Sequence, residues 1–433
     1  MRLRRAVVFA LAAAVWGASG VAAAETLEEA WRRAMKNDHA LAAIASETEA
    51  ARAGERAARA ARWPVVQASA GYTRLGTAPS LEVSGPDFAF RSPPLFDEDD
   101  FVSSAAQVRL PLYAGGQITA GIAAARSSRI AAEEMEQSSR AALKLDVARA
   151  YVGVLRARRA LEAAESSVAS LAAHVADVEQ MVERELVPRS DLLAARVALA
   201  NAQHARVRAA NDVQIAYAAY NRRLGEPLDR NTDLDQRIPT DPFLAKQPVE
   251  ALIERALASR SEVHGMAAQA EALAFQADAQ LAALRPRVEL TGGYNYFENE
   301  ILDREDFSMV GIGVTWSLFD GGQARNRAAA LRHAARAARL RLNDMRSMIE
   351  LEVRQAWLDV QAAQARIDAS REAVAQAEEN LRTARELYGA DLGTNTQVLE
   401  AVSLRTGAVT NRDNAMLDEA LAQLQLARAV GAL

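Results

Sequence analysis

Histidine is the side chain that most often binds zinc or moves protons near neutral pH, and this chain has five histidines. No two of them have the spacing that places a pair of metal ligands on one face of a helix. They are scattered at His39, His174, His204, His264 and His333. We therefore predict no metal site and no histidine-centred catalytic site, and we interpret the histidines as surface residues.

Two glycine pairs are the other feature that suggests chemistry, because glycine-rich turns between a strand and a helix can bind phosphate. Gly115-Gly116 and Gly321-Gly322 each separate a strand-like segment from a helix-like segment. Neither pair belongs to a Gly-x-x-x-x-Gly-Lys-Ser/Thr or a Gly-x-Gly-x-x-Gly pattern. We interpret both pairs as strand-to-helix turns, and we predict that the chain is not an enzyme and has no cofactor.

The charge balance argues against nucleic acid as a partner. The chain has 51 Lys and Arg against 56 Asp and Glu, a formal charge of −5, and loss of the three arginines within residues 1–24 would change it to −8. The arginines of residues 325–341 alternate with alanine, as on a solvated helix face. The absence of cysteine excludes disulfides, thiolate metal sites and a lipid-modified N-terminal cysteine.

The first 24 residues have the organisation of a secretory signal peptide. Three arginines precede an apolar run over residues 6–15, and the small residues Ala22, Ala23 and Ala24 precede Glu25. We predict that residues 1–24 are removed from an exported protein. No later apolar run reaches the roughly 20 residues of a membrane-spanning helix, whereas a membrane-spanning strand needs only about 10 residues.

An internal repeat indicates the architecture. Residues 112–117, Leu-Tyr-Ala-Gly-Gly-Gln, recur as residues 318–323, Leu-Phe-Asp-Gly-Gly-Gln, at an offset of 206. Upstream of these turns the offset is 222, which pairs Tyr72 with Tyr294. The difference between the two offsets predicts a 16-residue insertion in the first half.

The repeat divides the chain into two structural halves, residues 25–225 and 249–433. We predict that residues 226–248, rich in Pro and Asp, are a linker over the surface. The insertion falls within residues 76–100, which we predict to be an exposed loop because of their prolines, Pro79, Pro86, Pro93 and Pro94.

Four segments have the period-two alternation of half-buried strands. They are residues 64–75, 101–113, 287–297 and 307–319. In the last segment Val310, Ile312 and Val314 share one face, and glycine and polar residues share the other. An apolar outside and a polar inside are typical of a transmembrane barrel. A filled barrel needs about eight strands, and lipid does not tolerate an open edge, so either the sheet is water-soluble or several chains share one barrel.

The remaining sequence predicts two long helical hairpins, over residues 116–224 and 322–431. The first arm of each contains no proline and would be about 100 Å long at 1.5 Å per residue. Apolar and small residues alternate at spacings of four and three from Leu143 to Val182, and again from Ile349 to Tyr388, which predicts a coiled-coil seam.

The hairpins turn at two tips, residues 186–191 and 391–396, at the ends remote from the strands. In the first tip we predict that Ser190 or Asp191 caps the returning helix.

These features together resemble the TolC-type outer membrane efflux proteins. The resemblance rests on the signal peptide, the doubled order of strands and hairpin, the Tyr/Phe-x-Gly-Gly-Gln turns, and both tips. Residues 186–193 read Leu-Val-Pro-Arg-Ser-Asp-Leu-Leu, and residues 388–401 read Tyr-Gly-Ala-Asp-Leu-Gly-Thr-Asn-Thr-Gln-Val-Leu-Glu-Ala. The resemblance covers nearly the whole mature chain.

The resemblance implies a mainly α-helical fold with a transmembrane β portion. Three copies would each give four strands to one 12-stranded barrel, and their hairpins would form a helical barrel that narrows at the tips. It also implies an outer-membrane location in a Gram-negative bacterium and a passive channel for efflux or type I secretion. A periplasmic adaptor and an inner-membrane pump would dock at the tips, on Leu186, Val187, Pro188, Arg189, Ser190, Leu392, Gly393, Thr394, Asn395 and Thr396.

The tips depart from the family pattern at Glu185 and Asp391, where glycine is common. Three copies of Asp191, Asp391 and Glu400 would gather carboxylates at the narrow end, and carboxylate rings favour cations. An alternative interpretation is that Asp191 only caps its helix and that Glu400 pairs with Arg405 or another neighbour on its helix. For the whole protein, the alternative to a channel is a soluble periplasmic coiled-coil adaptor or scaffold.

Overall fold

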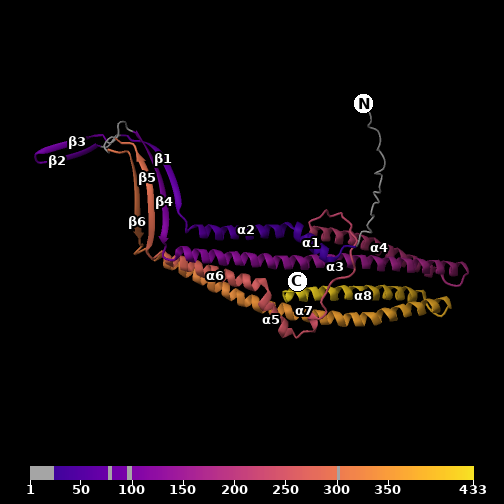
Figure 1. Ribbon diagram of the computed structural model, residues 1–433. Helices are drawn as coiled ribbons and strands as arrows, with labels where there is room; N and C mark the ends of the chain where they lie inside the picture. Colours follow the sequence, from indigo (N-terminus) through magenta and orange to yellow (C-terminus); the bar gives the residue numbers. More distant parts are fainter. Residues whose placement is uncertain (1–23, 77–79, 95–99, 300–302) are drawn as a thin grey trace, which may run out of the picture.

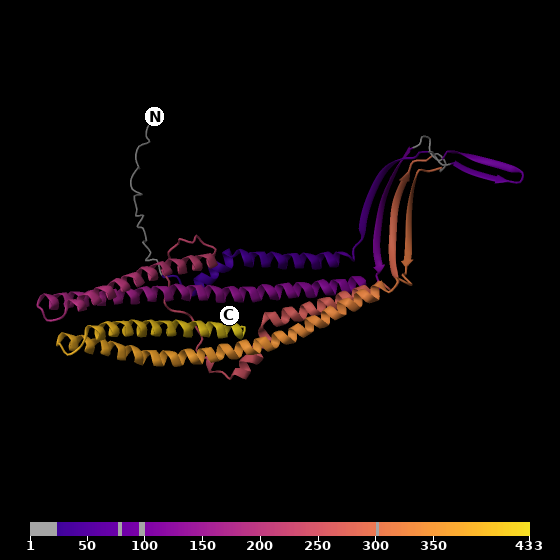
Figure 2. The same cartoon turned by 180° about the vertical axis from the view of Figure 1, so that it is seen from behind.

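The computed structural model describes residues 24–76, 80–94, 100–299 and 303–433, so residues 1–23 of the predicted signal peptide lie outside the described residues. Long helices carry a sheet at one end, and two helical hairpins end beside each other at the opposite end (Figures 1 and 2). The helices are α1 (Leu27–Asn37), α2 (His39–Ala60), α3 (Gln117–Glu183), α4 (Arg189–Leu224), the short 3-10 helix η1 (Leu244–Lys246), α5 (Val249–Ser259), α6 (Ser261–Ala282), α7 (Gln323–Gly389) and α8 (Asn395–Ala429). The strands are β1 (Val65–Arg74), β2 (Ser80–Gly85), β3 (Phe88–Pro94), β4 (Asp100–Tyr113), β5 (Arg287–Phe297) and β6 (Asp306–Thr315).

The long arms α3 and α7 each have 67 residues, which at 1.5 Å per residue is about 100 Å. No residue of the predicted seam is exposed, and the apolar members nearest the middle of each arm, such as Val147, Val154, Val353 and Val360, are fully buried. The spacing of four and three therefore identified the packed face of both arms correctly.

Two α-helices directly precede the first strand of each half, α1 and α2 before β1 and α5 and α6 before β5, in segments for which the sequence predicted no elements. In each half an 11-residue helix meets a 22-residue helix across a single residue, Asp38 or Arg260. The first pair begins at Thr26, whose hydroxyl accepts from Glu29 N while the Glu29 carboxylate accepts from Thr26 N. This capping box was the sequence signal that could have revealed α1.

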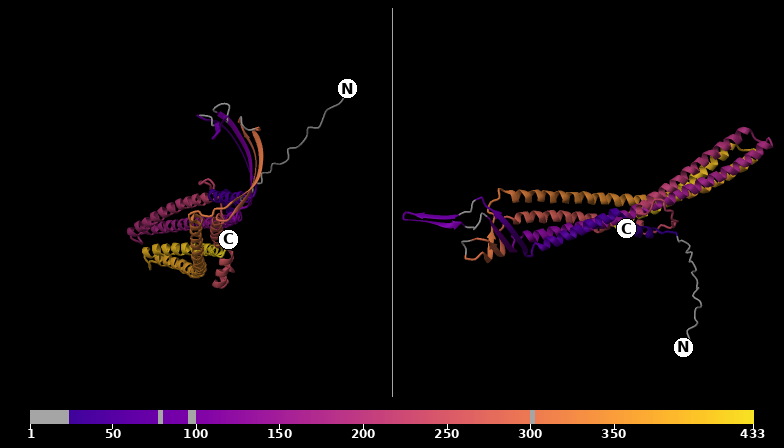
Figure 3. Two further views of the ribbon diagram at one scale, coloured as in Figure 1. Left: turned by 90° about the vertical axis from the view of Figure 1, so that its left-hand side faces the viewer. Right: turned by 90° about the horizontal axis from the view of Figure 1, so that it is seen from above.

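The main sheet is antiparallel in the order β1-β4-β5-β6 and forms one curved layer (Figure 3). The two strands of the first half pair in the same register as the two strands of the second half. Val66 pairs with Val108, and their repeat equivalents Val288 and Val314 pair with each other. The alternation therefore assigned the same side of the sheet to the apolar residues of all four strands.

Three predictions require correction. Residues 76–100 are not an irregular loop, because they include the two-stranded hairpin β2–β3, which projects beyond the sheet (Figure 1). Strand β6 ends at Thr315 rather than at residue 319. The linker does not lie wholly on the surface, because Leu234 is buried in the core of the first half and Leu244 in the core of the second.

The helices follow one another laterally in a fixed order. Near the sheet α2 packs on α3, α3 on α6 and α6 on α7, and toward the tips α4 packs on α3, α3 on α8 and α8 on α7. Helices α2 and α4 therefore form one lateral edge of the chain, and α7 forms the other. Within the described residues, every helix is too short or too polar to cross a membrane.

Candidate gate and docking surface at the hairpin tips

Each glycine pair lies between the second main-sheet strand of its half, β4 or β6, and the long arm that follows, α3 or α7. Gly115, Gly116, Gly321 and Gly322 have φ of 61°, 91°, 66° and 83°, a region that favours glycine. A Cβ on Gly115 would lie only 2.7 Å from the Arg285 Cβ. These glycines therefore form tight connections between strand and helix, with backbone conformations that other residues rarely adopt.

The two tips have the same backbone design. In the first, Leu186 N donates to Met181 O over 2.9 Å, and in the second, Leu392 N donates to Leu387 O over 2.8 Å. In both tips the residue before this leucine, Glu185 after α3 and Asp391 after α7, has a left-handed backbone conformation, with φ of 57° and 58°. Among the described residues these are the two non-glycine residues with positive φ, so each tip retains backbone strain.

The predicted cap of the first returning helix is wrong. Pro188 precedes α4, and neither Ser190 nor Asp191 makes a capping hydrogen bond there. In the second tip Thr394 caps α8 instead, because its hydroxyl accepts from Gln397 N and the Gln397 side chain accepts from Thr394 N over 2.8 Å. Asp191 lies in the first turn of α4, where a carboxylate interacts favourably with the helix dipole.

A polar network joins the two hairpins close to the tips. The Tyr388 hydroxyl donates to the Asp191 carboxylate over 3.3 Å, and Asn395 Nδ2 donates to Asp191 O over 3.0 Å. His174 Nε2 lies 2.7 Å from Asn395 Oδ1, and the His174 ring packs 5.5 Å from the Tyr388 ring. Burial and the nearby Asp191 raise the pKa of Tyr388 to about 12. The network therefore connects α3, α4, α7 and α8 of one chain.

This network corrects two interpretations. His174 is only 4% exposed, so it is a buried polar contact rather than a surface histidine; the other four histidines are exposed. Asn395 is 5% exposed and holds the tips together, so it does not lie on the outer surface with the other tip residues. The sequence did not reveal the roles of these two residues, because their partners come from helices more than 200 residues away in the sequence.

The three candidate gate carboxylates have different surroundings. The Asp191 side chain is half-buried and bonded to Tyr388, whereas Asp391 and Glu400 are exposed. In the described part of the chain, the ion pairs and hydrogen bonds do not join the three to one another. The alternative pairing of Glu400 with Arg405 is wrong, because the Arg405 guanidinium lies 3.5 Å from Glu378 and donates to Ser166.

The outer surface of the tips combines apolar and polar side chains. Leu186 and Leu392, one at each tip, are exposed, and Val187 and Gly393 are half-buried. Pro188, Arg189, Ser190, Thr394 and Thr396 are also exposed. An exposed leucine at the end of each hairpin is the kind of side chain that a docking partner would cover.

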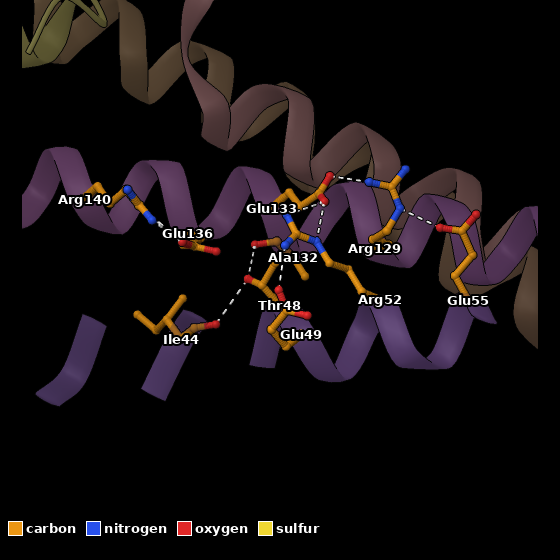
Figure 4. A network of polar contacts seen from close by, with 10 residues as sticks. All are labelled: Ile44, Thr48, Glu49, Arg52, Glu55, Arg129, Ala132, Glu133, Glu136 and Arg140. Atoms are coloured by element: carbon orange, nitrogen blue, oxygen red, sulfur yellow. Dashed lines mark hydrogen bonds and ion pairs between the residues drawn. The ribbon is translucent and has the colours of Figure 1, made fainter. Parts of the chain in front are cut away.

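A second polar network joins α2 and α3 (Figure 4). Arg129 Nε donates to the Glu55 carboxylate over 2.6 Å, and Arg52 Nε donates to Glu133 over 3.0 Å. Thr48, which is buried, donates to Ala132 O. Burial acts to raise the pKa of Glu55, but hydrogen bonds from Arg129 and Arg59 outweigh it and lower that pKa. The network holds α2 onto α3 by paired charges.

Known proteins resemble this chain in sequence over almost its whole length. The sequence profile described as outer membrane efflux protein matches residues 30–226 and 252–432. The chain is 26% identical over 437 residues to the outer membrane protein TolC of Vibrio cholerae, covering 98% of this chain and 93% of that protein.

Solved structures agree in fold. The outer membrane protein VceC of Vibrio cholerae superposes with a TM-score of 0.78 at 20% identity, covering 94% of this chain and 96% of that chain. The CmeC outer membrane channel of Campylobacter jejuni gives a TM-score of 0.78 at 14% identity, covering 94% and 85%. The chain therefore belongs to the outer membrane efflux protein family, as an outer-membrane channel protein with a large helical portion on the periplasmic side.

Proposed function

We propose that three copies of this chain close into one tube that serves as the passive exit duct of an efflux or secretion system. The observation that supports closure is the lateral order of the chain. One side ends in β1, α2 and α4, and the other ends in β6 and α7. Because the two sides differ, copies can assemble head to tail, with one side of each copy packed against the other side of the next. When such a ring closes, no strand edge stays unpaired.

Exposed apolar side chains on both lateral edges support the same arrangement. On α4 they are Val197, Val207 and Ile215, and on α7 they are Leu340, Leu351 and Leu358. Each is more than half exposed in the single chain. Burying such residues between neighbouring copies would stabilise the ring at roughly 25 cal/mol per Å² of apolar surface removed from water.

The strands and the family resemblance support three as the number of copies. Four strands are too few for a closed barrel, and three copies give the 12 strands that the family resemblance implies. Val310, Ile312 and Val314 would then face lipid, since they are on the apolar side and highly exposed. The opposite side, with Gln67, Gln107 and Arg109, would line the pore.

The test is to place a charge on each side of the same strand. Val314→Arg should reduce trimers in the outer membrane, because an arginine on the lipid side of a membrane-spanning strand is destabilising, by about 2–4 kcal/mol at the bilayer midplane and by less toward either interface. Thr315→Arg, one residue away on the pore side, is the matched control and should leave the trimer yield intact. Normal trimers from Val314→Arg would contradict the assignment of faces, and wild-type protein found only in the soluble periplasmic fraction would favour a scaffold.

We further propose that the tips form the gate and the docking surface for a periplasmic adaptor and an inner-membrane pump. Asp391 and Glu400 are exposed near the tips, so three copies would present six carboxylates to a narrow passage. Replacing them together by Asn and Gln should lower the preference for cations, measured as the reversal potential in a salt gradient. Glu372→Gln is the control, because Glu372 is an exposed acid on α7 that lies farther from the tip. An unchanged reversal potential with normal insertion would place the selectivity site elsewhere.

A further inference from the structure

Glu25 directly follows the predicted signal peptide, and it is built into the core of the first half. Glu25 N donates to Asp233 O over 2.8 Å, and Asp235 N donates to Glu25 O over 2.9 Å. The Tyr151 hydroxyl lies 2.7 Å from Glu25 O. Two residues later, Leu27 is fully buried. The start of the predicted mature chain is therefore fixed against the linker and α3.

The carboxylate of Glu25 has fewer hydrogen-bond donors than a buried carboxylate requires. Glu25 is 3% exposed, and among the described residues neither carboxylate oxygen accepts a hydrogen bond of normal geometry. Arg33 lies 3.3 Å from this carboxylate, but its guanidinium also lies 3.7 Å from Glu226. Burial raises the pKa of Glu25, and the charge of Arg33 only partly offsets this effect. The site therefore has room for a further donor or cation.

A second buried group at the same place also lacks a partner. The Tyr220 hydroxyl is beside Glu25 and fully buried, and in the part of the chain that the structure describes it makes no hydrogen bond of normal geometry. Of the six buried side-chain atoms without a hydrogen bond in that part, four belong to Glu25, Arg33 and Tyr220. Buried polar groups are usually paired, so this concentration indicates one incomplete site.

Removal of the signal peptide would create a suitable group at this place. Hydrolysis of the peptide bond between Ala24 and Glu25 consumes one water molecule, leaves a carboxylate on Ala24 and gives Glu25 an α-amine. An α-amine has a pKa near 8 and is mostly an ammonium at neutral pH. The amide of Glu25 has a single N–H, which is used by Asp233 O, whereas an ammonium has three.

We propose that the α-ammonium of Glu25, formed when residues 1–24 are removed, pairs with the buried Glu25 carboxylate and completes the contact of α1 with α3, α4 and the linker. One N–H keeps the bond to Asp233 O, and the other two are available to the carboxylate. A charge-assisted hydrogen bond of this kind is stronger in a buried site than in water. This proposal does not depend on the proposed ring of copies.

The same geometry sets the order of events. A protease needs an accessible, extended segment on both sides of the bond that it cuts. In the folded chain both backbone groups of Glu25 are hydrogen-bonded and Leu27 is fully buried. Cleavage therefore precedes the docking of α1, and the ammonium is already present when Glu25 enters the core.

The test moves the ammonium away from Glu25 while keeping the carboxylate. Insertion of Gly-Ser between Ala24 and Glu25 keeps the small residues before the cleavage site and makes Glu25 N an amide again. The insertion is made in the wild-type chain and in Glu25→Ala, which removes the carboxylate. Glu28→Ala is the matched control background, because Glu28 is an exposed acid in the first turn of α1. The intact mass of each purified protein gives its first residue.

Hydrogen exchange of the α1 amides, measured by mass spectrometry on the detergent-solubilised protein, reports how firmly α1 is docked. We expect the insertion to speed this exchange several-fold in the wild-type and Glu28→Ala chains, and to have little further effect in Glu25→Ala. A general disturbance from two extra residues would act in every background, so the dependence on Glu25 isolates the ion pair.

Three results would overturn the proposal. The first is a wild-type mature chain that begins at a residue other than Glu25. The second is an insertion effect of equal size with and without the Glu25 carboxylate, which would show that the extra residues act by their bulk. The third is unchanged exchange in all backgrounds, which would show that water or a bound cation completes the site instead.

Discussion

The helix pairs α2–α3 and α6–α7 occupy equivalent places in the two halves but are held together by different chemistry. In the first half Glu55 and Arg129 form an ion pair between the helices. Their repeat equivalents are Ala277 and Ala335, both buried and uncharged. An ion pair between α6 and α7, Asp278 with Arg332 at 3.8 Å, joins exposed side chains instead. The same helix geometry is therefore compatible with a polar contact in one half and an alanine contact in the other.

The difference follows from the neighbours of each helix. Helix α6 lies between α3 and α7 and is covered on two sides, so small apolar residues let both neighbours approach closely. Among the described residues helix α2 packs mainly on α3, and it keeps a broad surface in water. A paired charge is tolerated at such a border because its free hydrogen-bonding sites remain hydrated.

The largest expected effect comes from moving the charge into the apolar half. Ala277→Glu would bury a carboxylate at a position that is 0% exposed, and the repeat equivalent of Arg129 is the uncharged Ala335. We expect a destabilisation of about 3–5 kcal/mol, the cost of an unpaired buried charge, measured as loss of hydrogen-exchange protection in α6. Asp278→Glu, the adjacent exposed position, should have almost no effect. Equal protection in the two variants would contradict the difference between the halves.

A smaller effect is expected when the charge is removed from the polar half. Glu55→Ala leaves the Arg129 guanidinium without one partner at a site that is partly open to water, and we expect α2 to lose about 1–3 kcal/mol of protection. Glu55→Ala with Arg129→Ala reproduces the alanines of the second half and should recover part of that loss. If the double variant is less protected than the single variant, paired charge is not what distinguishes this contact.

The smallest effect concerns the tips, where the two halves are alike. Glu185→Gly and Asp391→Gly should each relieve left-handed strain and stabilise their tip by about 0.5–1 kcal/mol. Thermal unfolding of the detergent-solubilised trimer should show a similar small increase for each. Leu186→Gly, one residue later, is the control and should destabilise. A gain at only one tip would show that the tips differ more than their backbones do.

The local periodicities predicted much of the fold because they depend on residues close in sequence. The seam from Leu143 to Val182 is covered along its whole length, and Val108 and Val314 lie on the same side of the sheet. The prolines of residues 76–100 were interpreted as a loop because turn residues dominate the composition there. The hairpin forms because alternating residues such as Phe88 and Phe90 lie between those turns.

The candidate site was predicted less completely, because its contacts join distant helices. The tips and their turns were located from the doubled sequence, but the partners of His174 and Asn395 depend on how two hairpins lie against each other. Ser190 and Asp191 have the right chemistry for a cap, yet Pro188 fixes the turn so that α4 begins before them.

By itself the sequence determined the repeat, the periods of its helices and strands, and hence which side chains each element would bury or expose. Those properties are set by covalent geometry and by spacings of two to seven residues. Only the tertiary structure decided that Glu55 of the first helix pair is buried against a cation whereas Ala277 of the second is buried without one at the equivalent position, and that β6 ends at Thr315, where its pairing with β5 ends. Both outcomes depend on what lies beside an element, since burial and strand pairing are completed by residues far away in the chain.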